Sequence, residues 1–273
     1  MDFSKRVAIL GGGNIGTAIA KGLVASGKWS GKQITITRRQ VSLLDSLARQ
    51  GFTVQSDNRD AVKRSRMIII AVLPQDLVKV LHEVRRQLIP RKHIVMSTVT
   101  GVTIKEINKH IGKNVPVVRV MPNTAIALRE SMTCLAANPG SKEALELAKS
   151  IFDAVGRTMV ISEELMIPAT ALAACGIAFF LRAIRAASQG GIEIGFHADD
   201  ALIMAAQTAK GSAALLLGSE QHPETEIDKV TTPRGCTIAG LNQMEHQGFS
   251  SAMIKGIITS AEKAAKLYTD KKD

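Results

Sequence analysis

The sequence is poor in aromatic residues. One Trp, one Tyr and seven Phe make up 3% of the 273 residues. Proteins that bind single-stranded nucleic acids stack bases on aromatic side chains, so this scarcity argues against that class despite a formal net charge of +11. The positive charge instead favours anionic small-molecule ligands, and no nucleic-acid partner is predicted.

Cysteine is also scarce. Cys134, Cys175 and Cys236 are widely spaced and odd in number, which indicates neither a disulfide framework nor a zinc site. The six histidines are dispersed, with no pair four residues apart, so no metal site is predicted. The N-terminus, "MDFSKRVAIL", shows no apolar signal segment or small-residue cleavage site. We therefore expect a cytoplasmic protein.

Long uncharged runs are rare. The longest, "LMIPATALAACGIAFFL" at 165–181, contains Pro168 and is shorter than the roughly 20 apolar residues that span a bilayer. We expect no membrane span, and interpret the run as a helix buried at a subunit interface.

Short β-branched runs alternate with helical stretches over the first 160 residues. The candidate strands are 6–10, 33–37, 52–54, 67–72, 93–97, 115–120, 132–137 and 157–161. The early ones are separated by helical stretches near 14–27, 41–50, 57–65 and 75–88. Unbroken apolar strands that alternate with helices indicate an α/β fold with a doubly wound parallel sheet.

Beyond residue 162 the composition changes to Ala- and Leu-rich helical sequence. The expected helices are 163–189, 198–217, 224–230, 237–248 and 250–267. We therefore predict a nucleotide-binding domain at 1–162 and an all-helical domain at 163–273. The apolar helices hold more core residues than one subunit can bury, which predicts a homodimer through the helical domain, with higher oligomers open.

The stretch "VAILGGGNIGTAIAKGL" follows the first strand directly. Gly11, Gly13 and Gly16 have G-x-G-x-x-G spacing, with Asn14 and Ile15 between them at the start of a helix. The glycines allow a tight turn, close approach of a pyrophosphate and close helix–strand packing, and the helix N-terminus faces the phosphates. This context predicts dinucleotide binding.

The end of the second strand distinguishes between cofactors. It reads "TITRRQ", so Thr37, Arg38 and Arg39 stand where NAD enzymes usually place a carboxylate. Two guanidinium groups can bind a 2′-phosphate, and we predict NADP(H) in preference to NAD(H). The alternative is that both arginines are solvated loop residues.

Four further motifs, taken with the glycine turn, carry a resemblance. They are "SDNRDAV" (56–62), "AVLPQDL" (71–77), "VVRVMPNTA" (117–125) and "VTTPRGCTIAGLNQMEHQGF" (230–249). In this order, over nearly the whole chain, they make the sequence similar to pyrroline-5-carboxylate reductases. The resemblance implies a Rossmann-type domain, a helical dimerisation domain, and hydride transfer from NAD(P)H to the C=N bond of a small-molecule imine, giving proline.

The resemblance also implies site residues. Cofactor contacts are expected from Ala71, Val72, Leu73 and Pro74, and at the nicotinamide end from Met121, Pro122 and Asn123. Asn58 is expected either to reach the adenine-side ribose or to cap the helix at 57–65.

The turn before the helix near residue 237 is the expected substrate site. The residues concerned are Thr232, Pro233, Arg234, Gly235, Cys236 and Thr237. Backbone N–H groups at the start of a helix bind anions such as a carboxylate. By resemblance the Thr237 hydroxyl faces the ring nitrogen and is the catalytic candidate. The alternative is that Thr237 or Thr232 is a simple N-cap.

Several positions depart from the family pattern. Leu73 replaces a usual lysine, Val99–Gly101 and Cys175–Phe179 replace other motifs, Arg185 replaces a glutamate, and Arg234 replaces a glycine. These changes leave two interpretations: a divergent reductase, with the substrate carboxylate bound partly by Arg234 or Arg185, or a protein that keeps the NADPH site without the reaction or with another imine substrate.

Two further enzyme classes fit the sequence less well. Thiol chemistry at Cys236 would need a base, and no histidine is near it in the sequence. A β-hydroxyacid dehydrogenase would use a helical lysine such as Lys210, but the 230–237 turn has no counterpart in that family.

Overall fold

The computed structural model of the chain describes residues 5–112, 114–219 and 221–267. These residues form two compact units. We call residues 5–175 with 260–267 the sheet unit, and Gly176–Thr259 the helical unit. The sheet unit extends past the expected boundary at 162 because Met166, Thr170 and Ala171 are buried within it. The assignment of 163–273 to a substrate and dimerisation domain stays a prediction.

The sheet unit contains an eight-stranded sheet. Its strands are β1 (Val7–Leu10), β2 (Ile34–Thr37), β3 (Thr53–Gln55), β4 (Met67–Ile70), β5 (Ile94–Ser97), β6 (Val117–Met121), β7 (Ser131–Ala137) and β8 (Gly156–Val160). The order β3-β2-β1-β4-β5-β6-β7-β8 reverses direction between β1 and β4, as in a doubly wound fold. Each predicted strand is therefore confirmed within a few residues.

The prediction of a parallel sheet is wrong at one edge. Strands β1 to β6 are parallel, but β7 pairs antiparallel with β6, with Met121 opposite Cys134. A parallel connection needs a crossover of a dozen or more residues. The β6–β7 connection holds only a short 3-10 helix, Thr124–Leu128, so the chain turns back beside β6.

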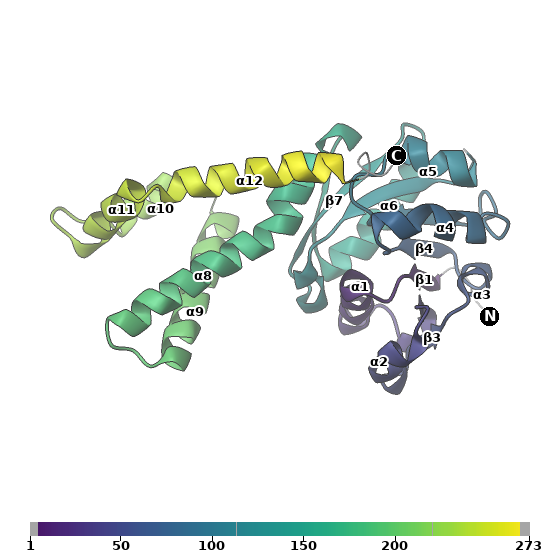
Figure 1. Cartoon of the computed structure of the whole chain (residues 1–273), viewed down its shortest axis with the longest axis horizontal. Coiled ribbons are helices and arrows are strands. Elements are labelled where there is room, and N and C mark those ends of the chain that lie inside the picture. The colour runs from purple at the N-terminus through teal and green to yellow at the C-terminus, as the bar shows by residue number, and fades with distance from the viewer. Residues whose placement is uncertain (1–4, 113, 220, 268–273) are drawn as a thin grey trace. The chain divides into compact units, whose positions relative to one another are not determined.

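Helices cover both faces of the sheet, which explains why its central strands are apolar throughout (Figure 1). Ile9 faces a core formed with α1 (Asn14–Ala25) and α6 (Lys142–Phe152). Leu10 faces the opposite core, formed with α3 (Asn58–Lys63), α4 (Pro74–Val84) and α5 (Ile104–Ile111). The short helix α2 (Asp45–Arg49) follows β2. This burial on both faces is typical of parallel sheets.

An ion pair between a buried arginine and a partly exposed glutamate joins β6 to the start of the helical sequence. The Arg119 side chain is 3% exposed, and its Nη1 lies 3.5 Å from Oε1 of Glu163. The same oxygen accepts a hydrogen bond from the backbone N–H of Ile104 at 2.6 Å. Burial lowers the pKa of Arg119, and the Glu163 carboxylate opposes that effect. Glu163 therefore neutralises a charge that the sheet unit buries.

The described residues beyond 162 are mainly helical, as predicted. A 3-10 turn (Glu163–Leu165), α7 (Met166–Ala169) and a π-helical segment (Thr170–Cys175) lead into α8 (Gly176–Glu193). The helices that follow are α9 (Ala198–Gly218), α10 (Pro223–Lys229), α11 (Cys236–His246) and α12 (Phe249–Lys266), whose last turns belong to the sheet unit.

The helical unit has little core of its own. Helix α8 packs against α9 (Figure 1), yet among the described residues of this unit only Gly176, Ser188 and Ala201 are buried. Large apolar side chains are instead exposed on several helices: Phe180, Leu181, Ile192, Ile194, Phe196, Leu202, Ile203, Met204, Leu215, Leu216, Leu217, Val230, Met244, Phe249, Ile254 and Ile258. Exposed apolar surface of this extent indicates an interaction face.

Two helical segments are long and apolar enough to cross a bilayer. Glu163–Glu193 spans 31 residues with a mean hydropathy of 1.8, and Ala198–Gly218 spans 21 residues with a mean hydropathy of 1.3. The uncharged run at 165–181 thus lies within a longer helical segment, and the expectation that the chain has no membrane span stays a prediction. Length and composition alone are weak evidence for a span, since helices packed between subunits share both properties.

Candidate active site

A cavity of about 630 Å³ opens at the carboxyl ends of β1, β2 and β4. This edge of a doubly wound sheet, at the reversal of strand order, is where such folds bind nucleotides. The cavity brings together nine of the predicted cofactor residues: Gly11, Gly13, Thr37, Arg38, Arg39, Asn58, Ala71, Val72 and Leu73. Asn14, Ile15, Gly16, Pro74, Met121, Pro122 and Asn123 do not line it.

The glycine turn is held to the neighbouring strand by backbone hydrogen bonds. The N–H groups of Gly11 and Gly12 donate to the Thr37 carbonyl at 3.2 and 2.8 Å. A side chain at Gly16 would overlap the Gly11 carbonyl, whereas a Cβ at Gly13 would meet no atom within 4 Å. Gly16 therefore permits close packing, and Gly13 leaves open space beside the turn.

The N-terminus of α1 faces this turn without a side-chain cap. Gly13 is the N-cap residue, and no side chain accepts a hydrogen bond from the first turn. The first amides of a helix lack intrahelical acceptors, and together with the helix dipole they favour an anion. The turn therefore provides the donor set that a pyrophosphate requires.

The two arginines at the end of β2 lie differently. Arg38 Nη1 donates to the Gly12 carbonyl at 2.8 Å, which holds this side chain over the glycine turn. Arg39 Nη2 lies 3.5 Å from Asp76 Oδ2, and its side chain is 83% exposed. A pair so exposed contributes little stability, so the Arg39 guanidinium can exchange Asp76 for another anion at small cost.

Asn58 is part of a hydrogen-bonded chain within the cavity. The Thr37 hydroxyl donates to Asn58 Oδ1 at 2.6 Å, and Asn58 Nδ2 donates to Glu83 Oε2 at 2.9 Å. These two bonds set the orientation of the amide. Asn58 therefore links the end of β2 to α4.

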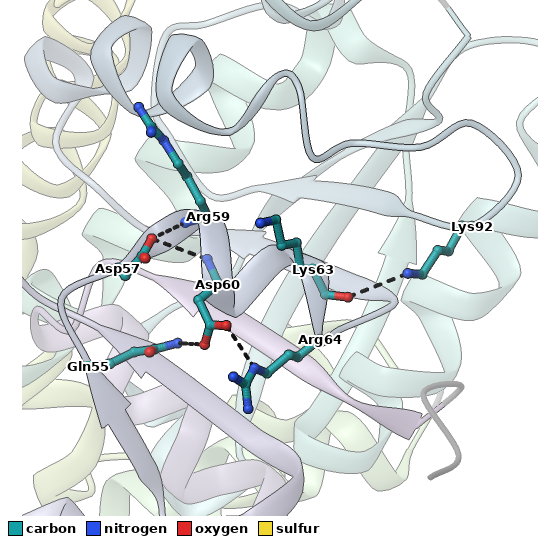
Figure 2. A network of polar contacts seen from close by, with 7 residues as sticks. All are labelled: Gln55, Asp57, Arg59, Asp60, Lys63, Arg64 and Lys92. Atoms are coloured by element: carbon teal, nitrogen blue, oxygen red, sulfur yellow. Dashed lines mark hydrogen bonds and ion pairs between the residues drawn. The ribbon is translucent and has the colours of Figure 1, made fainter.

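The expectation that Asn58 might cap its helix is wrong. The N-cap of α3 is Asp57, whose Oδ1 accepts from the backbone N–H groups of Arg59 and Asp60 at 2.8 and 3.2 Å (Figure 2). Asp60 in turn pairs with Arg64 one turn along the helix. Because Asp57 takes the capping role, the Asn58 side chain points instead to Thr37 and Glu83.

Sequence reasoning missed one wall of the cavity. Asp76, Lys79, Val80 and Glu83 line it from α4. Their spacing of i, i+3, i+4 and i+7 places them on one face of a helix. In the sequence, this helical spacing directly after the "AVLP" segment could have identified these residues as part of the cavity. The other residues missed are Gly12, Gln40, Leu43 and Ser56.

The expected nicotinamide-end residues follow β6. Met121, Pro122 and Asn123 are all buried. The Asn123 amide has protein partners on both sides: Oδ1 accepts from Ala125 N, and Nδ2 donates to the Ala173 carbonyl in the π-helical segment, both at 3.1 Å. Asn123 thus fixes the local backbone, and its contact with a cofactor stays a prediction.

The expected substrate turn lies between α10 and α11. Gly235 N donates to the Thr232 carbonyl at 2.9 Å and closes the turn. A side chain at Gly235 would collide with Thr232, so glycine is required there. Arg234 adopts a left-handed conformation with φ of 60°, which costs a non-glycine residue energy.

The interpretation of Thr237 or Thr232 as an N-cap is wrong. The N-cap of α11 is Gly235, and no side chain caps this helix. Thr237 is the second residue of α11 and is half-buried; among the residues that the structure describes, its hydroxyl has no hydrogen-bond partner. The start of α11 therefore offers uncapped amides and an unused hydroxyl.

The remaining candidates have simpler environments. Arg185 and Lys210 are exposed on α8 and α9. Leu73 is 60% exposed at the cavity. Cys134 is buried, and burial raises the pKa of its thiol, which makes it unreactive. Cys236 is exposed at the first position of α11.

The fold and cavity together define a class of protein. A glycine turn at the switch point of a Rossmann-type sheet, followed by helices with uncovered apolar faces, is typical of a nicotinamide-dependent oxidoreductase with a helical dimerisation domain. Family models agree. Residues 6–101 match the family "NADP oxidoreductase coenzyme F420-dependent", and residues 163–267 match "Pyrroline-5-carboxylate reductase dimerisation".

Individual relatives extend this likeness to the whole chain. Pyrroline-5-carboxylate reductase 1 of Dictyostelium discoideum is 56% identical over 98% of the chain, which spans 51% of that protein's length. Pyrroline-5-carboxylate reductase 2 of the same organism is 49% identical over 96% of the chain and 93% of its own. A solved pyrroline-5-carboxylate reductase from Coxiella burnetii superposes with a TM-score of 0.86 and 30% identity. The match covers 97% of this chain and 99% of the solved one. The chain belongs to the pyrroline-5-carboxylate reductase family.

Proposed function

We propose that the chain reduces the C=N bond of pyrroline-5-carboxylate to give L-proline, with NADPH as reductant. The observation that carries this proposal is the 49% identity to a pyrroline-5-carboxylate reductase over nearly the full length of both chains. Likeness of this extent includes both the cavity and the 232–237 turn. We expect the protein to act in the cytoplasm, in proline biosynthesis.

The cavity fits the proposed cofactor. Open space at Gly13 and the uncapped amides of α1 suit a pyrophosphate. Arg38 and Arg39 stand at the end of β2, where a 2′-phosphate would lie, and charge-assisted hydrogen bonds from guanidinium groups favour that phosphate. We infer from these two residues that NADP(H) binds more tightly than NAD(H).

The cofactor, when bound, supplies a hydride, so the chain has little acid–base work to do. Its main task is to position the imine carbon and exclude water. The uncapped amides at the start of α11 hold the substrate carboxylate in this proposal. The Thr237 hydroxyl orients the ring nitrogen by a hydrogen bond. An alcohol is a weak acid, so the proton comes from water or from an imine that is already protonated.

Arg234 distinguishes this chain from the family pattern. It holds a left-handed backbone conformation that favours glycine. Such strain is commonly retained at functional sites. We propose that the Arg234 side chain adds a charge-assisted hydrogen bond to the substrate carboxylate. Arg185, which lies exposed on α8, is the second candidate for this role.

The exposed apolar faces of the helical unit support a homodimer. Side chains such as Phe180 and Leu217 are 62% and 68% exposed within one chain. We propose that a second copy covers them. Size-exclusion chromatography with light scattering should give twice the monomer mass of 29.2 kDa or a multiple of it; a monomer would contradict the proposal.

A direct assay tests the reaction. Purified protein is mixed with NADPH and pyrroline-5-carboxylate, and the absorbance of the reduced cofactor is followed. NADPH binding is measured separately by calorimetry. Consumption of NADPH that depends on the imine supports the proposal. Tight NADPH binding without consumption supports the second candidate, a non-catalytic nucleotide-binding protein, which the replacement of glycine by Arg234 favours. A Gly13→Ala variant, which we expect to bind NADPH more weakly, is the negative control.

A further inference from the structure

Two histidines that are distant in sequence meet on the surface of the sheet unit. His82, on α4, and His110, on α5, place their Nε2 and Nδ1 atoms 3.0 Å apart. The ring centroids are 5.0 Å apart and the ring planes make an angle of 62°. Neither residue lines the cofactor cavity. The pair is therefore separate from the site described above.

The spacing of the two nitrogens is that of neighbouring ligands on one metal ion. Imidazole nitrogens lie about 2.0–2.1 Å from zinc, so two of them at angles near 90–110° are roughly 2.9–3.4 Å apart. The 3.0 Å separation of the facing nitrogens falls in that range. In the hydrogen bond the two nitrogens point at each other, so each ring must turn by roughly 40° for both lone pairs to point at one ion about 2.0–2.1 Å away.

The other ring nitrogen of His110, Nε2, faces the carboxylate of Glu106. His110 Nε2 lies 3.8 Å from Glu106 Oε1, one turn earlier on α5, and this nitrogen is buried without a hydrogen bond. Histidines that bind metals commonly donate their other N–H to a carboxylate, which fixes the tautomer. Glu106 also binds Lys109 Nζ at 2.6 Å, so its carboxylate is held in place.

We propose that His82 and His110 form a binding site for a borderline divalent cation such as Zn²⁺, Ni²⁺ or Cu²⁺. Imidazole nitrogens suit these ions. No group of three or more His, Cys, Asp and Glu side chains suited to one ion occurs in the described parts of the chain, so water completes the coordination. His82 is exposed and leaves room for that water.

Binding requires a change of tautomer and no other chemistry. In the hydrogen-bonded pair, one of the two facing nitrogens carries a proton. For both to bind the ion, that proton moves to the far nitrogen of the same ring. If the ring is His110, the proton reaches Nε2, which faces Glu106.

Calorimetric titration tests the proposal. Full-length protein freed of metal by a chelator is titrated with Zn²⁺ alone at neutral pH. We expect one saturable equivalent, lost in His82→Ala and in His110→Ala. Glu106→Gln should weaken binding by about tenfold. His246→Ala and Cys236→Ser, which remove an exposed histidine and an exposed thiol elsewhere, should retain it.

A second measurement separates folding from binding. Circular dichroism checks that each variant is folded, and Zn²⁺ should raise the melting temperature of the unmodified protein but not of the two histidine-to-alanine variants. Absence of a saturable equivalent in the unmodified protein would overturn the proposal. So would an equivalent that survives both histidine substitutions or is lost with His246 or Cys236.

Discussion

The second glycine of the turn allows a sharp test of the cofactor site, because it has a matched partner. In Gly13→Ala the new Cβ would meet no protein atom within 4 Å, and the backbone φ of −85° is ordinary for alanine. In Gly16→Ala the new Cβ would overlap the Gly11 carbonyl oxygen. The first change should therefore affect the ligand, and the second should affect the fold.

The expected losses of stability in the two variants follow from this difference in contacts. Relative to good N-caps, alanine typically costs about 1 kcal/mol and glycine a few tenths, so Gly13→Ala should lower the free energy of unfolding by roughly 1 kcal/mol or less. Gly16→Ala pushes α1 away from the backbone at Gly11. Overpacking of this kind lowers the free energy of unfolding by about 1–3 kcal/mol. A methyl group at Gly13 keeps the pyrophosphate from the backbone. We expect NADPH affinity to fall by at least about tenfold, or 1.4 kcal/mol.

Chemical denaturation measures the two stabilities, and calorimetry measures the Kd for NADPH. Reduced NADPH affinity at nearly unchanged stability is the expected result for Gly13→Ala. If that variant bound NADPH as well as the unmodified protein does, no phosphate would approach this turn, and the cofactor argument would fail. Equal loss of stability in both variants would show that the space beside Gly13 is needed for folding.

Four further predictions test other parts of the molecule. Replacing Arg38 and Arg39 together by serine should raise the Kd for NADPH about tenfold more than that for NADH; equal changes would refute the role in cofactor choice. Thr237→Ala should lower kcat roughly 10- to 100-fold while leaving the NADPH Kd unchanged, and complete loss would indicate direct proton transfer by the hydroxyl. Glu163→Gln leaves the buried Arg119 charge unpaired and should cost about 2–4 kcal/mol in urea unfolding; unchanged stability would contradict the buried-pair argument. Burial, with a smaller effect of Lys92, lowers the pKa of His93 from its ordinary 6.5, so the unfolded chain takes up a proton that the folded one resists. Stability should therefore fall as the pH drops below 6.5, and His93→Gln should show a smaller fall; an identical pH profile would exclude this cause.

Much of the fold could be predicted because its strands are buried on both faces. A strand such as β4, "MIII", must be apolar throughout, and such runs alternating with helices are visible in the sequence. The antiparallel β7 was not predictable in the same way. Strand β7 is largely buried like the central parallel strands, and its direction depends on the short connection after Met121 rather than on its own residues.

The candidate site was predictable in part for a similar reason. The glycine turn and the arginines after β2 occupy consecutive positions, so their spacing carries the geometry. The capping roles did not follow from the sequence. Asp57 and Asn58 are neighbours with similar capping ability, and only the packing of Thr37 and Glu83 around Asn58 decides which one caps α3.

The sequence by itself determined the doubly wound sheet, the glycine turn and the helical second half, because local spacing and continuous apolar runs encode them. Only the tertiary structure decided which side chains from separate elements meet. Glu83 reaches Asn58 from α4 across 25 residues, and His82 meets His110 across 28. Such meetings depend on how helices pack over the sheet, and no local pattern in the chain records them.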